Sequence, residues 1–391
     1  GTGGITARAF GEGDTEEVLL SGLRGILCGV CIGAVLVLLQ APIAWVGFHF
    51  AATSEESTVT QASLYLRCRL LGAPAALANY AVSAWLNAVQ HPRAMLATNL
   101  VLNLSNTVLC VTFAWVLDFG TAGVGFATAV ANYIALAFGV YMISGIYPRL
   151  KNGGDVDLWS SVTLPKILDA AKVAQLAAMQ GNIFLRALFL QFIIADFTML
   201  GAAMGVVPLA ANNLLMQLQM MISYGADGLA NAAEALVGEA AGRGDANEVR
   251  AIMRAVAKWS VLLALAYSVV YVTFGDMILE AFTSHIEVVL YASTYLRFQW
   301  VAPVFSVAAY VMDGVFVGAN QFARMRDANF IAMVVFLAIS HRHPMSNSCL
   351  WSALMAHFIV RGGVLLWHYP SIEALAAERG ERMLLPGAAR Q

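Results

Sequence analysis

The sequence contains few charged residues. Asp, Glu, Lys and Arg make up 12% of the 391 residues, and hydrophobic residues make up 60%, whereas soluble domains carry about 25% charged residues. This composition predicts a protein that lies in a lipid bilayer. The 22 Lys and Arg residues do not outnumber the 24 Asp and Glu residues. The chain therefore lacks the surplus of cations with which a simple nucleic-acid-binding protein neutralises phosphates.

Cysteine is also scarce, and the motifs of common enzymes are missing. The five cysteines lie in apolar segments, where we interpret them as small hydrophobic residues. Cys28 and Cys31 have the spacing of a redox or metal motif, but no second ligand pair accompanies them. His341 and His343 could bind a metal only with a third ligand, which the neighbouring sequence does not offer. Because there is no Gly-rich phosphate loop or catalytic triad either, we expect no enzyme, cofactor or metal site.

Long apolar runs are abundant. A membrane-spanning helix needs about 20 apolar residues, and the fold class predicted is an all-α membrane protein with about ten full spans. The predicted spans are 18–40, 64–89, 94–117, 121–146, 170–200, 207–238, 250–278, 288–320, 326–340 and 349–368.

The basic residues fall almost entirely on one side of these spans. Seventeen Lys and Arg residues, Arg361 among them, are assigned to one side and only Arg342 to the other. The positive-inside rule then makes the first side cytoplasmic. We predict a multi-pass protein of a bacterial-type inner membrane, with the linker 147–169 and the tail 371–391 in the cytoplasm.

The two halves of the chain resemble each other. Residues 9–18 and 240–249 are identical at six of ten positions with an offset of 231, and Tyr65-Leu66-Arg67 matches Tyr295-Leu296-Arg297. This repeat predicts two pseudo-symmetric six-helix bundles related by an axis along the membrane normal. By the same offset the first bundle, residues 1–146, lacks its first span and most of its second. The second bundle is predicted at 170–370.

The main acidic residues within predicted spans are Asp227, Glu234 and Asp313. A charge at the bilayer centre costs about 2.5–3.5 kcal/mol on insertion scales, so such residues usually face water or protein and have a function. A buried carboxyl group can hold a proton near neutral pH, which a proton carrier requires. Arg186 is the expected counter-charge to one of these acids. A purely structural ion pair is the alternative.

Other polar and flexible side chains recur on single helix faces. We interpret them as candidates for a substrate cleft, with interhelical hydrogen bonding or core packing as the alternative. The candidates are Asn79, Asn87, Asn103, Asn212, Met216, Met220, Asn231 and Tyr310.

Several motifs resemble the multidrug and toxic compound extrusion (MATE) transporters, and within them the DinF-like branch. They are residues 182–186 (NIFLR), 224–238 (YGADGLANAAEALVG) and 313–318 (DGVFVG). The resemblance implies two six-helix bundles with a central cleft. It also implies antiport, in which small organic compounds, often cationic or amphipathic, leave while protons or sodium ions enter. Protons are the expected coupling ion, and the site residues implied are Arg186, Asp227, Glu234 and Asp313.

Two alternatives remain at this point. A lipid-linked precursor flippase shares this architecture but should line its cleft with cations, and few arginines lie within the spans. An inactive truncated remnant is the other, because the family's first span carries an acidic residue tied to ion coupling and that span has no counterpart here. The expected partners are small organic substrates and the lipid bilayer, without nucleic acid. The sequence does not indicate the oligomeric state.

Overall fold

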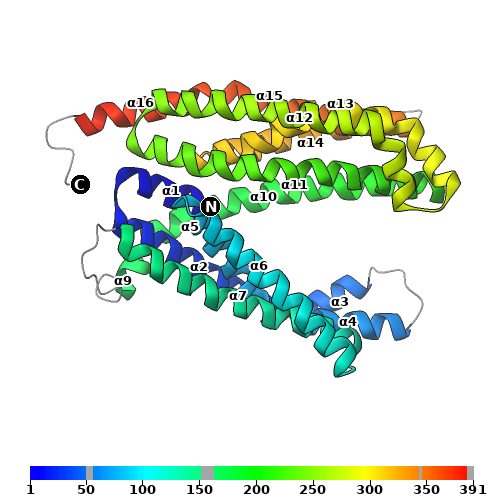
Figure 1. Ribbon diagram of the computed structural model, residues 1–391, viewed down its shortest axis with the longest axis horizontal. Helices are drawn as coiled ribbons and strands as arrows, with labels where there is room; N and C mark the ends of the chain where they lie inside the picture. The colour runs from blue at the N-terminus through cyan, green and yellow to red at the C-terminus, as the bar shows by residue number, and fades with distance from the viewer. Residues whose placement is uncertain (50–55, 151–162, 343–345, 385–391) are drawn as a thin grey trace. The chain divides into compact units, whose positions relative to one another are not determined.

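The computed structural model describes residues 1–49, 56–150, 163–342 and 346–384, and throughout this part of the chain the regular structure is helical (Figure 1). The chain forms two compact units. Residues 2–173 make up the N unit, and residues 174–391 together with Gly1 make up the C unit. The fold class predicted from the sequence, an all-α membrane protein, is confirmed.

The N unit begins with α1 (Thr2–Glu12) and α2 (Thr15–Leu38). Its remaining helices are α3 (Gln40–His49), α4 (Glu56–Leu70), α5 (Ala73–Ala88), α6 (Pro92–Val111), the π-helical turn η1 (Thr112–Val116), α7 (Gly120–Leu150) and the short α9 (Leu164–Ile167). Trp85 of α5 is fully buried against α2, where Gly22 leaves room for its indole. The indole N–H of Trp85 donates to the Val18 carbonyl at 2.8 Å.

The C unit consists of most of α10 (Ala170–Ala203) and six further helices. These are α11 (Val206–Arg243), α12 (Ala246–Phe282), α13 (Ile286–Gly318), α14 (Phe322–Ser340), α15 (Asn347–His368) and α16 (Pro370–Leu384). Its core is built around buried side chains such as Leu215 and Leu218 of α11, Phe316 of α13 and Trp351 of α15.

Seven helical segments of the described chain are long and apolar enough to cross a membrane. Each of them matches one predicted span. The predicted spans without such a match are 64–89, in α4 and α5, 207–238, in α11, and 326–340, in α14. The α11 helix is long but contains Asp227, Glu234 and Glu239, which lower its apolar character. That these three segments also cross the bilayer stays a prediction.

The predicted continuous span 64–89 is wrong, because the helix breaks at Leu71 and Gly72 between α4 and α5. Pro74 stands in the first turn of α5, where its missing N–H is tolerated. The counterpart helix α13 contains Pro303 and remains continuous. A similar interruption at Leu39 separates α2 from α3.

The two units share local details that follow the repeat seen in the sequence. Gly13 and Gly244, 231 residues apart, both adopt positive φ angles, 74° and 73°. Each is followed by an aspartate that caps the next helix: Asp14 accepts from the Glu17 N–H and Asp245 from the Glu248 N–H, both at 2.9 Å. These matching caps show that the repeat extends to the backbone.

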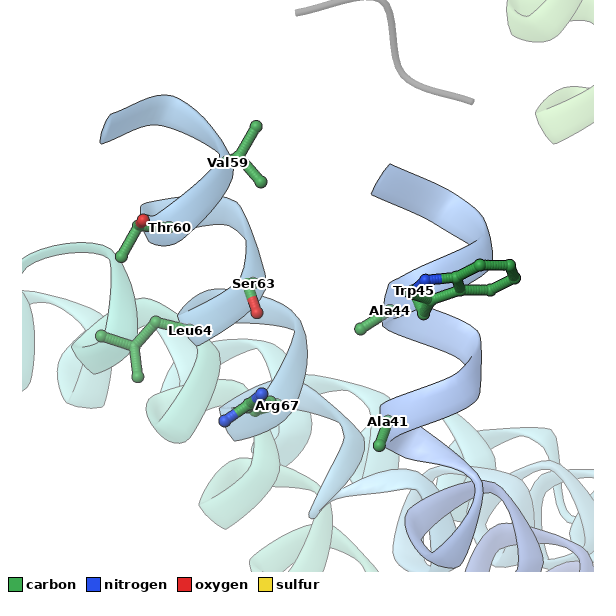
Figure 2. A pocket seen from close by; sticks show the side chains of 8 residues that line it. All are labelled: Ala41, Ala44, Trp45, Val59, Thr60, Ser63, Leu64 and Arg67. Carbon is green, nitrogen blue, oxygen red and sulfur yellow. The ribbon is translucent and has the colours of Figure 1, made fainter. Parts of the chain in front are cut away.

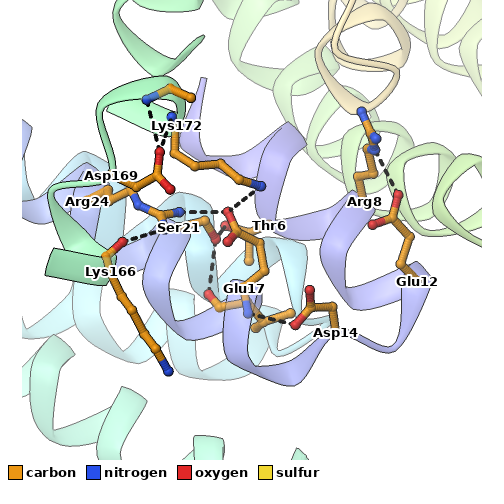
Figure 3. Close-up of polar contacts among 12 residues, drawn as sticks. Thr6, Arg8, Glu12, Asp14, Glu17, Ser21, Arg24, Lys166, Asp169 and Lys172 are labelled. Carbon is orange, nitrogen blue, oxygen red and sulfur yellow. Dashed lines mark hydrogen bonds and ion pairs between the residues drawn. The ribbon is translucent and has the colours of Figure 1, made fainter. Parts of the chain in front are cut away.

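Ionic contacts fix the end of the linker to the N unit (Figure 3). The buried Arg24 of α2 donates to Glu17 at 2.7 Å and to the backbone carbonyls of Lys166 and Ile167 at 2.8 and 3.1 Å. Lys166 pairs with Glu16 at 2.6 Å, and Lys172 with Glu17 at 3.6 Å. The short α9 is therefore held against the start of α2.

Candidate functional site

A cluster of charged side chains lies inside the C unit, around Asp313 of α13. One carboxylate oxygen of Asp313, Oδ2, accepts hydrogen bonds from two arginines: Arg186 of α10 at 2.5 Å, and Arg361 of α15. The cluster thus joins three helices that are far apart in the sequence. The predicted pairing of Arg186 with one of the intramembrane acids is observed, and its partner is Asp313.

The cluster is well shielded from solvent. The exposed fractions of the side chains are 1% for Arg361, 15% for Asp313 and 24% for Arg186. Two guanidinium groups face one carboxylate, so the cluster carries one excess positive charge while Asp313 is ionised. Removing Asp313 would leave two uncompensated guanidinium groups and be strongly destabilising, whereas removing one arginine leaves a neutral pair.

Several polar atoms of the cluster have no hydrogen-bond partner within the described residues. They are Oδ1 of Asp313, Nε of Arg186, and Nε and Nη1 of Arg361, and all are buried. His357, one turn before Arg361 on α15, is fully buried. Unsatisfied buried groups are uncommon and costly in proteins.

Tyr310 extends the cluster to α11. The guanidinium carbon of Arg361 lies 5.6 Å from the centroid of the Tyr310 ring, within the range of a cation–π interaction. Gln219 of α11 donates from Nε2 to the Tyr310 hydroxyl at 3.4 Å. The ring of Phe358 meets the Tyr310 ring edge-on, with the centroids 5.6 Å apart.

Two glycines of α13 allow α11 to approach closely. A Cβ atom on Gly314 would collide with the backbone of Ala230, and one on Gly318 with the backbone of Glu234. Small residues four positions apart are typical of tightly packed membrane helices. This seam places Glu234, which is half-buried, beside the C-terminal part of α13.

The other predicted coupling residue, Asp227, lies elsewhere on α11. Its side chain is exposed, and within the described residues it forms no hydrogen bond or ion pair. Asn231, one turn further along, is half-buried. Of the predicted coupling residues, the structure therefore brings together only Arg186 and Asp313.

The predicted cleft residues divide into several environments. In the N unit, Asn79 is buried and donates to the Asn132 carbonyl at 2.9 Å, Asn87 is buried, and Asn103 is exposed. In the C unit, buried Asn212 donates to Asn347 at 2.7 Å and accepts from the indole of Trp351 at 2.9 Å. Met216 and Met220 are half-buried. Among the cleft candidates, only Tyr310 belongs to the cluster around Asp313.

Sequence reasoning missed two members of the polar interior. Arg361 was assigned to a cytoplasmic loop, which is wrong, because it lies within α15 and binds Asp313. Asp196 of α10 was not singled out, although it is an acid within a predicted span. Its carboxylate lies 3.7 Å from Nε2 of His341. No cluster of potential metal ligands occurs among the described residues, and His343 lies outside them.

Comparisons with known proteins agree with this architecture. The MatE family model matches residues 1–112 and 183–340. The DNA damage-inducible protein F of Escherichia coli is 33% identical over 362 residues, covering 92% of this chain and 77% of that protein. Protein DETOXIFICATION 43 of Arabidopsis thaliana is 26% identical over 266 residues, covering 68% of this chain and 48% of that protein.

Solved structures show the same fold. A MATE protein in the bent conformation superposes with a TM-score of 0.82 at 18% identity, covering 96% of this chain and 82% of the other. A MATE transporter of Vibrio cholerae, also in a bent form, gives a TM-score of 0.78 at 18% identity over 96% of this chain and 84% of the other. The chain therefore belongs to the MatE family of membrane transporters and is not an enzyme.

Proposed function

We propose that this protein is a secondary active antiporter that exports organic compounds in exchange for cations, with protons as the expected coupling ion. The observation that carries the proposal is Asp313, a carboxylate held inside the C unit between Arg186 and Arg361. A charged group at this depth is costly, which favours a functional role. The substrates proposed are drug-like molecules, often cationic or amphipathic.

Protonation of Asp313 gives the cluster two states. With Asp313 ionised, both arginines are bound and α10, α13 and α15 are held together at one point. A proton on Asp313 would remove its negative charge and weaken both ion pairs. The helices could then repack, so that proton binding changes the conformation of the C unit.

Coupling requires that substrate and proton influence each other. If protonation weakens substrate binding, bound substrate must by linkage lower the proton affinity by the same factor. Asp227, whose carboxylate is exposed, is the acid most accessible to a cationic substrate. Glu234, on the α11–α13 seam, is the third candidate proton carrier.

The experiment is substrate-driven proton release from the purified protein in detergent, with tetraphenylphosphonium as the probe and a pH-sensitive dye as the readout. The unaltered chain should release protons when the probe is added. Asp313→Asn, Asp227→Asn and Glu234→Gln are compared with Glu378→Gln, an exposed glutamate of α16, as the matched control. Release that persists in all three acid variants would refute these assignments.

The same assay distinguishes proton coupling from sodium coupling. Proton release that is unaffected when sodium is replaced by potassium supports proton coupling. If the probe displaces bound sodium instead, the antiport proposal stands with sodium as the ion. We further propose that the chain lies in a bacterial-type inner membrane, with the segment before α10 and the C-terminal tail in the cytoplasm.

A further inference from the structure

Three basic residues form a row along one side of α12 in the C unit: Arg250, Arg254 and Lys258. They are spaced four residues apart, so they follow one another on the same face of the helix. All three are exposed. Arg250 is bound by Glu373 of α16 at 2.6 Å. Within the part of the chain that the structure describes, the side chains of Arg254 and Lys258 form no ion pair or hydrogen bond. Two neighbouring positive charges therefore remain uncompensated.

An apolar surface continues this basic row along the same face of α12. Leu262, Leu265 and Val269 belong to it and are 53%, 52% and 61% exposed. Residues 259–275 contain no charged side chain. At 1.5 Å per residue they extend roughly 26 Å, which is close to the thickness of the hydrocarbon core, about 30 Å. This part of α12 can therefore cross the core with its apolar face in contact with lipid.

The basic row then lies at the level of the lipid headgroups. Lys258 directly precedes the uncharged segment, and Arg254 lies one turn, roughly 6 Å, further from the core along the axis. Phosphate groups occupy the layer just outside the hydrocarbon core. Trp259, which is 55% exposed, stands at the boundary, where tryptophan is enriched in membrane proteins.

The basic row has no counterpart in the N unit. With the offset of 231, the equivalent positions of α2 are occupied by Leu19, Leu23 and Leu27. Arg24 of α2 is buried and bound to Glu17. Arg67 of α4 lines a pocket between α3 and α4 (Figure 2) and belongs to no such row. The repeated fold does not require cations at these positions, which favours a specific role for them in α12.

We propose that this face of α12 binds an anionic phospholipid. The lipid phosphate would accept charge-assisted hydrogen bonds from Arg254 and Lys258, and an acyl chain would lie along Leu262, Leu265 and Val269. The partner is a membrane lipid rather than a soluble phosphate, because the cations and the apolar surface are continuous. On the predicted orientation this end of α12 faces the cytoplasmic leaflet, whose anionic lipids attract basic residues. The proposal does not rest on antiport.

Native mass spectrometry of the purified full chain tests the proposal. The delipidated protein in detergent is mixed with palmitoyl-oleoyl phosphatidylglycerol, or with phosphatidylcholine of the same acyl chains, and bound lipid is measured at increasing lipid concentration. We expect phosphatidylglycerol to bind more tightly than phosphatidylcholine. Glycerol 3-phosphate, which carries the phosphate without acyl chains, should not displace the bound lipid.

Charge variants locate the site. Arg254→Gln and Lys258→Gln should each weaken phosphatidylglycerol binding about fivefold, equivalent to about 1 kcal/mol for one basic residue near an anionic lipid, and the double variant about 30-fold. Phosphatidylcholine binding should not change. Arg254→Lys combined with Lys258→Arg keeps both charges and should retain binding. The matched control is Arg342→Gln combined with Arg382→Gln, which removes two charges from exposed positions of the C unit outside this face.

Four results would overturn the proposal. Equal binding of the two lipids would show that α12 contacts acyl chains alone. Unchanged phosphatidylglycerol binding in the double variant of Arg254 and Lys258, or an equal loss in the control variant, would show that the basic row does not recognise the phosphate. Displacement of the lipid by glycerol 3-phosphate would assign the two cations to a soluble phosphate instead.

Discussion

At the scale of single residues, the least exposed charge of the cluster is Arg361. Its guanidinium is 1% exposed and binds Asp313, and losing a hydrogen bond to a charged group costs about 1.5–3 kcal/mol. We therefore expect Arg361→Gln to lower the unfolding temperature in detergent far more than Arg382→Gln. Arg382 forms an exposed pair with Glu378, and such surface pairs contribute about 0–1 kcal/mol.

A double variant separates the ion pair from simple packing. In Arg361→Gln, Asp313 keeps Arg186 as its partner, whereas Asp313→Asn leaves both guanidinium groups unpaired. In the double variant only Arg186 is left unpaired. The combined destabilisation should then be smaller than the sum of the two single effects, because residues in one network are coupled. Strict additivity would show that Arg361 stabilises the fold independently of Asp313.

The sequence predicted part of this cluster, and the reason for its limit is physical. Asp313 and Arg186 stood out because each lies inside a long apolar run. Arg361 lies inside a run as well, but it was counted with the loop cations, seven residues before the end of α15. Hydropathy shows that a charge within an apolar run has a free-energy cost. Only the three-dimensional contacts show which partner compensates that charge.

At the scale of helices, the contact between α11 and α13 depends on the absence of side chains. A Cβ on Gly314 or Gly318 would collide with the α11 backbone, and overpacking typically costs about 1–3 kcal/mol. We expect Gly314→Ala and Gly318→Ala each to lower the unfolding temperature. Gly363→Ala on α15 is the control, because no atom lies within 4 Å of its added Cβ. Equal stability of all three variants would contradict the close packing.

The helix breaks were less accessible to sequence analysis than the helices themselves. Apolar runs predicted the positions of most helices because length and hydrophobicity are properties of the local sequence. The break at Leu71 and Gly72 lies within such a run, and hydropathy does not register a change of backbone direction. Pro74 was the available signal, but Pro303 lies inside an uninterrupted helix, so proline alone does not decide the outcome.

At the scale of the whole chain, the distribution of basic residues predicts which ends of the helices face the cytoplasm. With Arg361 placed inside α15, 16 of the assigned Lys and Arg residues remain on one side, some of them within helices as Arg24 is in α2, and Arg342 alone remains on the other. The positive-inside rule depends on such a bias in short loops, so the corrected count leaves the predicted orientation unchanged. The turn between α12 and α13 should face the exterior, and α9 and α16 should face the cytoplasm.

Cysteine accessibility in intact cells tests this orientation. In a chain without its native cysteines, a membrane-impermeant maleimide should label Ser284→Cys, in the exposed turn between α12 and α13. Thr163→Cys and Glu378→Cys, both exposed positions next to or within α9 and α16, should react only after the membrane is permeabilised. Because α12, α13, α14 and α15 follow one another through short turns, all four helices are oriented by the result at Ser284. Three predicted crossings, by α13, α14 and α15, separate Ser284 from Glu378 and place the two positions on opposite sides of the membrane. Labelling of Glu378→Cys in intact cells would place both on the same side, which requires an even number of crossings. That result would contradict a membrane-spanning α14, the shortest of the predicted spans.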